Sequence, residues 1–338
     1  MVNDLVEAVD RIAFNTEFSG AVRVDHGAEV VLAKAYGYAN RAYRVPNTIG
    51  TRFAIASGTK GISALTVASL IEEGVLDWST TARSLLGTDL PMVNNDVTVA
   101  HLLEHRSGVG DYFDEEDTRS TNDPVLPVPV HELETTEKYL PVLDGWPTKF
   151  ESGARFSYCN SGYVLLALIA ERATRLSFND LVRQRVCEPA GMRETAFLRS
   201  DELPESAALG YLSTGGQRTN VFHLPVLGSG DGGIYTTLAD FHLLWSAAFN
   251  GLVVSRDVID ELVIPRSDSP TVSKRYGRGF WLHESSSAVT LEGSDAGVSF
   301  RSVHDPVSRA THTVVSNVSD GAWPLARHLE AALSSSSR

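Results

Sequence analysis

The sequence predicts an α+β protein in which a central antiparallel sheet, flanked by helices, is shared by the two ends of the chain. Strand-like segments lie near both termini, each beside a helical pattern, and helical patterns occupy most of the middle. We therefore expect a single domain over residues 1–335. Its sheet lobe should lie at about 1–62 and 240–335, and a mostly helical lobe at about 63–239.

The N-terminal part of this sheet is predicted from periodicity. Apolar residues recur at helical spacing between positions 2 and 13, which predicts an opening amphipathic helix. Residues 20–24 and 29–33 are strand-like and flank a turn at 25–27, which predicts a β-hairpin.

The C-terminal part repeats this arrangement. Residues 288–291, 298–303 and 310–315 are strand-like, and a helix is expected from about 323 to 333. Because both ends carry strands and a helix, we expect them to meet in one sheet.

The middle of the chain is expected to be mainly helical. Helix-like apolar patterns cover residues 97–105, 162–174 and 178–186. Residues 114–148 break the pattern with an acidic run and five prolines. A connection of this length without regular structure is usually a binding loop or lid.

Composition narrows the class of protein. The 338 residues are 43% apolar and 21% charged, which is typical of a globular protein. A net charge of −13 argues against nucleic acid or an anionic membrane as the main partner. No signal-peptide pattern and no apolar run of membrane-spanning length is found, and two cysteines fit a reducing compartment. We therefore expect a cytoplasmic protein.

The stretch Ser57-Gly58-Thr59-Lys60, just before a long apolar helical pattern, is the first candidate for chemistry. Residues three apart on a helix are neighbours, so the Lys60 amine is expected beside the Ser57 hydroxyl. Burial and the positive end of a helix both disfavour an ammonium, so this lysine can supply a neutral amine as a base. Ser57 would then be activated for attack on a carbonyl.

A structural interpretation of Ser57 stands beside this one. Serine is a common helix N-cap, and about one S-x-x-K match is expected by chance in a chain of this length. Two features argue against a cap. Lys60 stands where a capping box carries Glu or Gln, and a cation in the first turn opposes the helix dipole.

The second candidate is Tyr158-Cys159-Asn160, directly before a predicted helix. A tyrosine close to a lysine shares its proton more easily than a free phenol, so Tyr158 could carry the Ser57 proton to a leaving group. Asn160 could hold the network and donate to a substrate carbonyl. The segment 38–40 also matches Y-x-N, and we interpret it as the end of a strand.

In this order, the two motifs resemble the serine β-lactamase and penicillin-binding superfamily, in its branch of class C β-lactamases, D-alanyl-D-alanine carboxypeptidases and family VIII esterases. The likeness runs from about residue 20 to 317 through the stretches 51–60, 71–77, 97–108, 188–195, 232–240 and 276–281. It implies a β-lactamase/transpeptidase-like fold and an acyl-enzyme mechanism. Ser57 would be the nucleophile, and Lys60 and Tyr158 the acid/base pair. Asn160 would support them.

The third motif departs from the family pattern. By the resemblance, Leu291-Glu292-Gly293-Ser294 lies where relatives carry Lys-Thr-Gly or His-Thr-Gly on the strand lining the site. Leu291 then replaces the cation. Glu292 adds a negative charge near the place where β-lactams and peptide C-termini put a carboxylate, and like charges repel.

Two consequences of this departure are expected. The oxyanion hole needs only backbone N–H groups, by analogy those of Ser57 and Ser294, so acyl transfer is retained while carboxylate recognition is weakened. Arg278 or His283 could restore the missing cation from a neighbouring strand.

The sequence thus predicts a serine hydrolase acting on a carboxylic ester or a small amide. The alternatives are a β-lactamase or D-amino-acid-specific peptidase, an amidase or aminopeptidase whose substrate carries an amine, and a catalytically inactive relative that binds acyl compounds or a protein. The expected partner is a small ester, amide or lactam, with neither nucleic acid nor membrane. No cofactor and no metal are expected.

Two further motifs suggest other chemistry. His101-Leu-Leu-Glu104-His105 matches an inverted zinc-peptidase pattern, but Arg106-Ser-Gly108 is expected to end that helix at once. The glycine-rich segment 228–233 matches G-x-G-x-x-G without a surrounding βαβ unit, so we expect a close backbone approach beside the pocket rather than a dinucleotide site.

Overall fold

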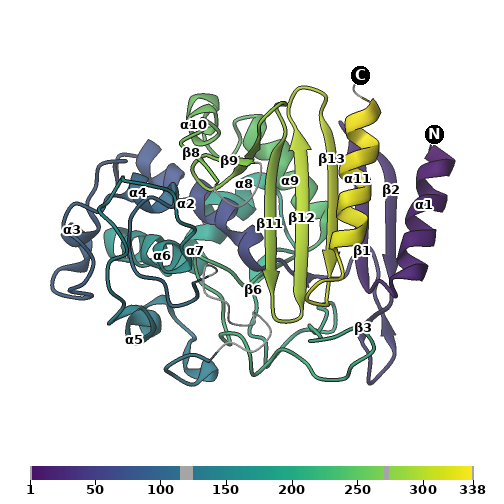
Figure 1. Cartoon of the computed structure of the whole chain (residues 1–338), viewed down its shortest axis with the longest axis horizontal. Helices are drawn as coiled ribbons and strands as arrows, with labels where there is room; N and C mark the ends of the chain where they lie inside the picture. The colour runs from purple at the N-terminus through teal and green to yellow at the C-terminus, as the bar shows by residue number, and fades with distance from the viewer. Residues whose placement is uncertain (1, 115–124, 270–273, 337–338) are drawn as a thin grey trace.

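The computed structural model describes residues 2–114, 125–269 and 274–336. Within these residues the main sheet has eight strands in the order β2-β1-β13-β12-β11-β10-β9-β8, and every neighbouring pair is antiparallel (Figure 1). The strands are β1 Gly20–His26, β2 Glu29–Tyr36, β8 Ser267–Asp268, β9 Lys274–Tyr276, β10 Trp281–His283, β11 Val289–Asp295, β12 Val298–Asp305 and β13 Ala310–Ser316.

The two ends of the chain meet in this sheet, as the sequence predicted. The first strand pairs with the last along its whole length, from Gly20 opposite Ser316 to His26 opposite Ala310. The turn between β1 and β2 is closed by Gly27, which has a positive φ of 59° that glycine adopts without steric cost. The predicted hairpin and the three predicted C-terminal strands are therefore confirmed.

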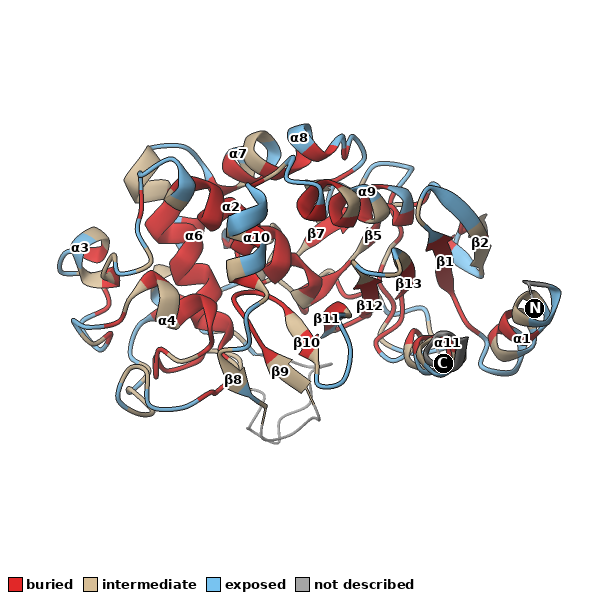
Figure 2. Ribbon diagram, turned by 90° about the horizontal axis from the view of Figure 1, so that it is seen from above, coloured by how far each residue is buried: buried red, intermediate tan, exposed pale blue. Residues whose placement is uncertain are grey.

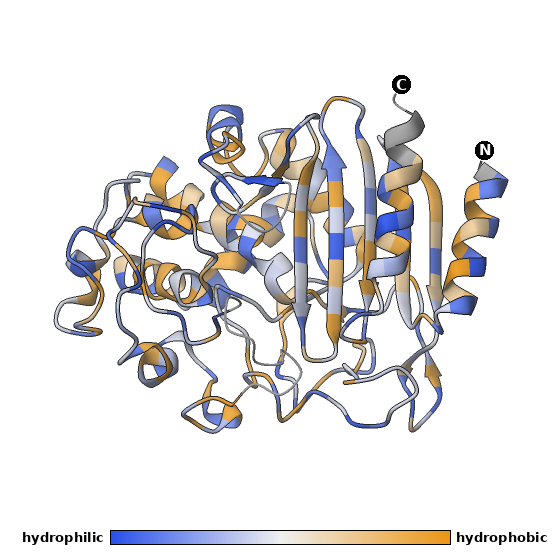
Figure 3. Cartoon of the chain, viewed as in Figure 1, coloured by the Kyte–Doolittle hydropathy of each residue, from blue (hydrophilic) through white to orange (hydrophobic). Residues whose placement is uncertain are grey.

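Helices cover both faces of the sheet. The terminal helices α1 (Val2–Asn15) and α11 (Trp323–Ser336) lie together on one face, and α9 (Leu238–Phe249) lies on the other (Figure 2). Strand residues alternate between the faces, so Val22 and Val24 pack beneath α1 and α11. Blue polar and orange apolar residues are interleaved along α1, as in a helix with one apolar face (Figure 3). The sheet is thus sandwiched between two apolar layers.

A helical part built around α2 (Thr59–Glu72) and α6 (Asn160–Thr174) lies beside the sheet. Both helices are apolar on nearly all sides, because other elements surround them. The helices and turns around them are α3 Ala82–Leu86, α4 Val99–Leu103, α5 Leu140–Leu143, α7 Phe178–Val182, a π-helical turn Arg183–Cys187, α8 Glu188–Ala190 and α10 Arg256–Leu262. No helix among the described residues is long and apolar enough to cross a bilayer.

Two small sheets lie beside the main sheet and the helical part. One pairs β3 (Tyr38–Asn40) with β4 (Val45–Pro46), and the other has the order β5-β7-β6, with bounds Phe53–Ala54, Ile234–Thr236 and Ala196–Phe197. The second sheet matters for the site, because β5 leads directly into the turn that carries Ser57.

The segment 114–148 was predicted to lack regular structure, and this is wrong for its second half. It contains the 3₁₀ turns Val130–Glu132 and Thr136–Tyr139, followed by α5. Leu133, Tyr139 and Val142 are buried in the core, and this tertiary burial orders short turns that carry no periodic pattern. Residues 115–124 lie outside the described part of the chain. The division into two lobes stays a prediction.

Candidate active site

Ser57 lies in a 3₁₀ turn, Ala56–Gly58, between β5 and α2. The N-cap of α2 is Gly58, and no side chain caps the helix, so the structure does not support the capping interpretation of Ser57. Ala56 has a φ of 45°, a left-handed conformation that costs a residue with a side chain some strain. This strained turn directly precedes the serine.

Lys60 extends from the first turn of α2 back to Ser57. Its side chain is buried, with only 2% of the residue exposed, and its Nζ donates hydrogen bonds to Ser57 Oγ, Asn160 Oδ1 and the Asp231 carbonyl oxygen, each 2.8 Å long. The same nitrogen lies 4.9 Å from the centroid of the Tyr158 ring. The structure therefore brings together the serine, amine, phenol and amide that the sequence picked out.

The glycine-rich segment 228–233 reaches this point because β5 pairs with β7. Ala54 lies opposite Tyr235, and the Ile55 N–H donates to the Ile234 carbonyl oxygen, which sets the residues before β7 against the Ser57 turn. A Cβ on Gly230 would lie 2.2 Å from the Tyr163 carbonyl oxygen, so only glycine fits there. The expected close backbone approach beside the pocket is confirmed.

Tyr158 and Asn160 are held at the start of α6 by a buried carboxylate. Asp111 accepts hydrogen bonds from the backbone N–H groups of Asn160 (2.8 Å) and Ser161 (2.9 Å), and from the Ser161 hydroxyl. Burial raises the pKa of Asp111 to about 6, although these hydrogen bonds lower it. No local pattern indicates this role, because Asp111 lies 49 residues from Asn160 in the sequence.

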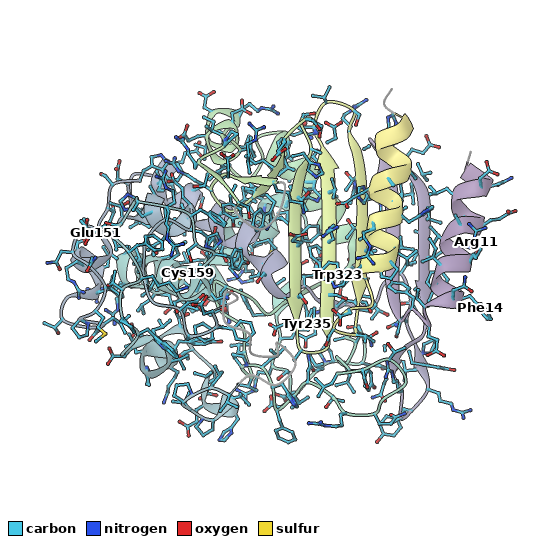
Figure 4. All side chains as sticks on the ribbon, in the orientation of Figure 1. Arg11, Phe14, Glu151, Cys159, Tyr235 and Trp323 are labelled. Atoms are coloured by element: carbon cyan, nitrogen blue, oxygen red, sulfur yellow. The ribbon has the colours of Figure 1, made fainter. Side chains whose placement is uncertain are left out.

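His105 holds Tyr158 from the other side. Its ring centroid lies 4.2 Å from that of Tyr158, and its Nδ1 accepts a hydrogen bond from the Cys159 N–H. The Tyr158 ring also stacks against Trp281 at an interplanar angle of 6°. Figure 4 places Cys159 in the interior of the molecule, well away from α1 with its labelled Arg11 and Phe14.

Leu291 and Gly293 of the third motif lie on the face of β11 that contacts the helical part. The Leu291 side chain packs against Gly61, where a Cβ would lie 2.5 Å from it. A Cβ on Gly293 would lie 2.6 Å from the Ser57 nitrogen, so glycine allows the strand to approach the Ser57 turn. Strand β10 pairs with β11 only at Val289 and Thr290. Within the described part of the chain, the residues of β11 after Thr290 are therefore unpaired on that edge and face the Ser57 turn.

Glu292 points to the opposite face of the sheet. Its carboxylate pairs with Lys274 (3.1 Å) and Arg301 (2.8 Å), and these two cations hold the pKa of Glu292 below its usual value against the effect of burial. Neither suggested substitute cation is directed to Ser57. Arg278 is buried between Glu104 and Glu261, and the His283 Nε2 lies 3.1 Å from the Thr290 hydroxyl.

The residues of the zinc-like motif are engaged elsewhere. The His101 Nδ1 accepts from the Thr98 N–H in a capping box at the start of α4, and Glu104 pairs with Arg278. The described residues contain no group of three histidine, cysteine or acidic side chains arranged to hold a metal ion.

Ser57 lines a pocket that is partly open to solvent. Its described lining carries two carboxylates, Asp231 and Asp295, and neither lysine nor arginine. The lining residues are Ser57, Tyr112, Phe113, Leu126, Asn160, His223, Leu224, Pro225, Asp231, Gly232, Ser294 and Asp295. Leu126 comes from the segment 114–148, so part of the predicted lid does line the site.

Comparison with known protein families assigns the chain to a family. The model of the family described as Beta-lactamase matches residues 9–335, nearly the whole chain. The chain belongs to the beta-lactamase family. The superfamily resemblance and the β-lactamase/transpeptidase-like fold predicted from the sequence are therefore confirmed.

Relatives of this beta-lactamase-family chain agree with the assignment. The crystal structure of a penicillin-binding protein from Bacillus halodurans is 35% identical, with a TM-score of 0.89 over 95% of this chain and 99% of that one. Putative penicillin-binding protein PbpX of Bacillus subtilis is 26% identical over 78% of this chain, and a D-aminopeptidase of Brucella anthropi is 29% identical over 78%. The chain spans 62% and 49% of the lengths of these two relatives.

Proposed function

We propose that this chain is a serine hydrolase that forms a covalent acyl-enzyme on Ser57 and acts on carboxylic esters or small amides. The observation that carries the proposal is the 2.8 Å hydrogen bond between Lys60 Nζ and Ser57 Oγ at the floor of an open pocket. A serine beside a buried amine has the arrangement of an activated nucleophile.

The proposed reaction has two stages. In its neutral form Lys60 donates only to Asn160 and the Asp231 carbonyl oxygen and accepts from the Ser57 hydroxyl, and it takes that proton as the Ser57 oxygen attacks the substrate carbonyl. The proton then passes from the Lys60 ammonium through Tyr158 to the leaving alcohol or amine as its bond to the acyl carbon breaks. The backbone N–H groups of Ser57 and Ser294 stabilise the oxyanion. Water then attacks the acyl-enzyme by the reverse proton route and releases the acid. Asn160, bonded to Lys60, keeps the amine aimed at the serine.

Substitution of the nucleophile tests the proposal. Ser57→Ala should lower turnover of p-nitrophenyl butyrate by at least about 10³-fold and abolish labelling by a fluorophosphonate, because the acyl-accepting oxygen is gone. Lys60→Ala should come close to the same loss. Retained turnover in Ser57→Ala would refute the assignment. A folded wild-type protein that is inert to fluorophosphonate would instead indicate a non-catalytic relative that binds acyl compounds.

A second candidate is a β-lactamase or D-amino-acid-specific peptidase, which the D-aminopeptidase and penicillin-binding relatives support. The absence of lysine and arginine from the described pocket lining disfavours substrates that carry a carboxylate, such as β-lactams. Nitrocefin hydrolysis or acylation by penicillin at low concentration would favour the lactam alternative over the ester.

A further inference from the structure

We propose that Asp231 binds a protonated amine of the substrate, so that the enzyme selects aminoacyl esters and amides whose side chain is apolar. The inference rests on the proposed hydrolase function and names its substrate class. It is carried by the position of one buried carboxylate between the nucleophile and a second, more apolar pocket.

Asp231 lies beside the reacting groups. Its carbonyl oxygen accepts from Lys60 Nζ, and the residue lines the same pocket as Ser57. Only 9% of Asp231 is exposed. Because Ser57 and Asp231 line one pocket, a substrate bound there with its carbonyl against Ser57 can reach Asp231 with the atoms next to that carbonyl.

A buried carboxylate is costly unless it is paired with hydrogen-bond donors or a cation. The Tyr112 hydroxyl donates to Asp231 Oδ2, and burial nevertheless raises the pKa of Asp231 against the effects of Lys60 and Tyr112. An ammonium at the mouth of the pocket would add charge-assisted hydrogen bonds that favour the ionised form.

The described lining of the pocket carries acidic side chains, which attract a protonated amine. Asp295 is the other acidic residue of the described lining, and no lysine or arginine is found there. Glu292, the negative charge expected beside the site, pairs with Lys274 and Arg301 on the other face of the sheet. Asp231 is the residue placed to act on the substrate.

A second pocket adjoins the first and gives the side-chain preference. The two pockets share six of the described lining residues, which are Tyr112, Leu224, Pro225, Asp231, Gly232 and Asp295. The second is lined mainly by aromatic and aliphatic side chains, among them Tyr139, Leu198, Val226 and Tyr235. An amine held at Asp231 thus leaves an apolar substituent free to enter this pocket, which is the geometry of an α-aminoacyl group.

The test compares two substrates that differ only in the amine. Hydrolysis of phenylalanine ethyl ester, as each enantiomer, and of ethyl 3-phenylpropanoate is followed at a pH of about 6.5, below the usual pKa of an α-amino group at about 7.7–8.0. For the wild type, kcat/KM for one enantiomer of the amino ester should exceed kcat/KM for ethyl 3-phenylpropanoate by at least about 10-fold. Asp231→Asn should lower this ratio of amino ester to desamino ester by about 10- to 100-fold. Because the readout is a ratio, a general loss of activity does not mimic the effect.

Two variants serve as controls. Asp257→Asn removes the same charge from an exposed position on α10 and should leave the ratio unchanged. A loss of the ratio in Asp295→Asn but not in Asp231→Asn would overturn the assignment to Asp231.

If Asp231→Asn does not fold, the wild type alone still tests whether the enzyme selects substrates that carry an amine. Equal turnover of the amino and desamino esters, with Ser57 labelled by fluorophosphonate, would overturn this inference and leave the proposed hydrolase intact. No turnover of either ester and no labelling would overturn both.

Discussion

His105 fixes the backbone on both sides of Tyr158. Its carbonyl oxygen accepts from the Ser157 N–H at 2.9 Å, and its Nδ1 accepts from the Cys159 N–H at 3.0 Å. The ring must be neutral to accept at Nδ1. Burial, and then the charge of Lys60, hold the pKa of His105 well below its usual value, so the contact survives at acidic pH.

This residue also has a φ of 53°, which asparagine adopts more readily than most residues. His105→Asn offers a side-chain oxygen in place of Nδ1, whereas His105→Phe keeps the ring but leaves the Cys159 N–H without an acceptor. We expect His105→Phe to lower kcat for p-nitrophenyl butyrate by about 10- to 100-fold with little change in KM, because a misplaced Tyr158 moves protons poorly. His105→Asn should retain more activity.

The pH profile of kcat distinguishes a misplaced Tyr158 from a general loss of folded enzyme. It should change in shape for His105→Phe and keep its shape for His131→Gln, which alters an exposed histidine. A His105→Phe enzyme with wild-type kcat and pH profile would show that His105 is not needed to place the phenol.

At this scale the sequence predicted Ser57, Lys60, Tyr158 and Asn160 as partners, and the structure brings them together. Asp231 was missed for a physical reason. Its place beside Lys60 depends on the pairing of β5 with β7, whose residues lie about 180 positions apart, and a single aspartate among glycines carries no periodic pattern.

At the scale of elements, the start of α6 depends on one carboxylate. The first N–H groups of a helix lack partners within the helix, and Asp111 satisfies those of Asn160 and Ser161. Asp111→Ala should lower the free energy of unfolding by about 1–3 kcal/mol, because buried N–H groups lose their acceptor, and should reduce kcat as Asn160 moves from Lys60.

A second capping residue provides the matched control. Ser177→Ala removes the cap of α7, where the exposed Ser177 side chain accepts from the Asp180 N–H, and should lower stability without altering kcat. Urea unfolding and ester hydrolysis measure both effects. Wild-type stability and activity in Asp111→Ala would contradict the proposed anchoring.

Elements with strong periodicity were predicted well from sequence, and those without it were not. The terminal strands and α1, α6 and α11 follow from residue spacing alone. The turns between residues 130 and 143 form because Leu133 and Tyr139 are buried by distant parts of the chain, which no local pattern reports. The face that Glu292 occupies has the same origin, because it is set by Lys274 and Arg301 on other strands of the sheet.

For the whole molecule, buried histidines in the sheet predict a loss of stability in acid. Burial lowers the pKa of His304 to about 4 and that of His312 to about 3, against about 6.5 in the unfolded chain. The unfolded chain therefore binds more protons as pH falls below about 6.5, so stability present above that pH is lost toward pH 3. Asp111, whose pKa is raised, acts in the opposite direction between about pH 6 and 4.

The lowered pKa values of His105, His304 and His312 outweigh the raised values of Asp111 and Asp231, so we expect the free energy of unfolding to fall by a few kcal/mol between about pH 7 and 4. Urea unfolding across this range measures the change, and His312→Gln should make the dependence shallower. Constant stability over the range, or a rise toward acid, would contradict the burial of neutral histidines.

The pairing of β1 with β13 has a consequence for biosynthesis. The hairpin of β1 and β2 is translated before the whole helical part, yet the partner for the other edge of β1, strand β13, follows only after that part. Until then that edge exposes unsatisfied backbone groups that can recruit another nascent chain. Productive folding thus depends on protecting this hairpin until β13 has been translated.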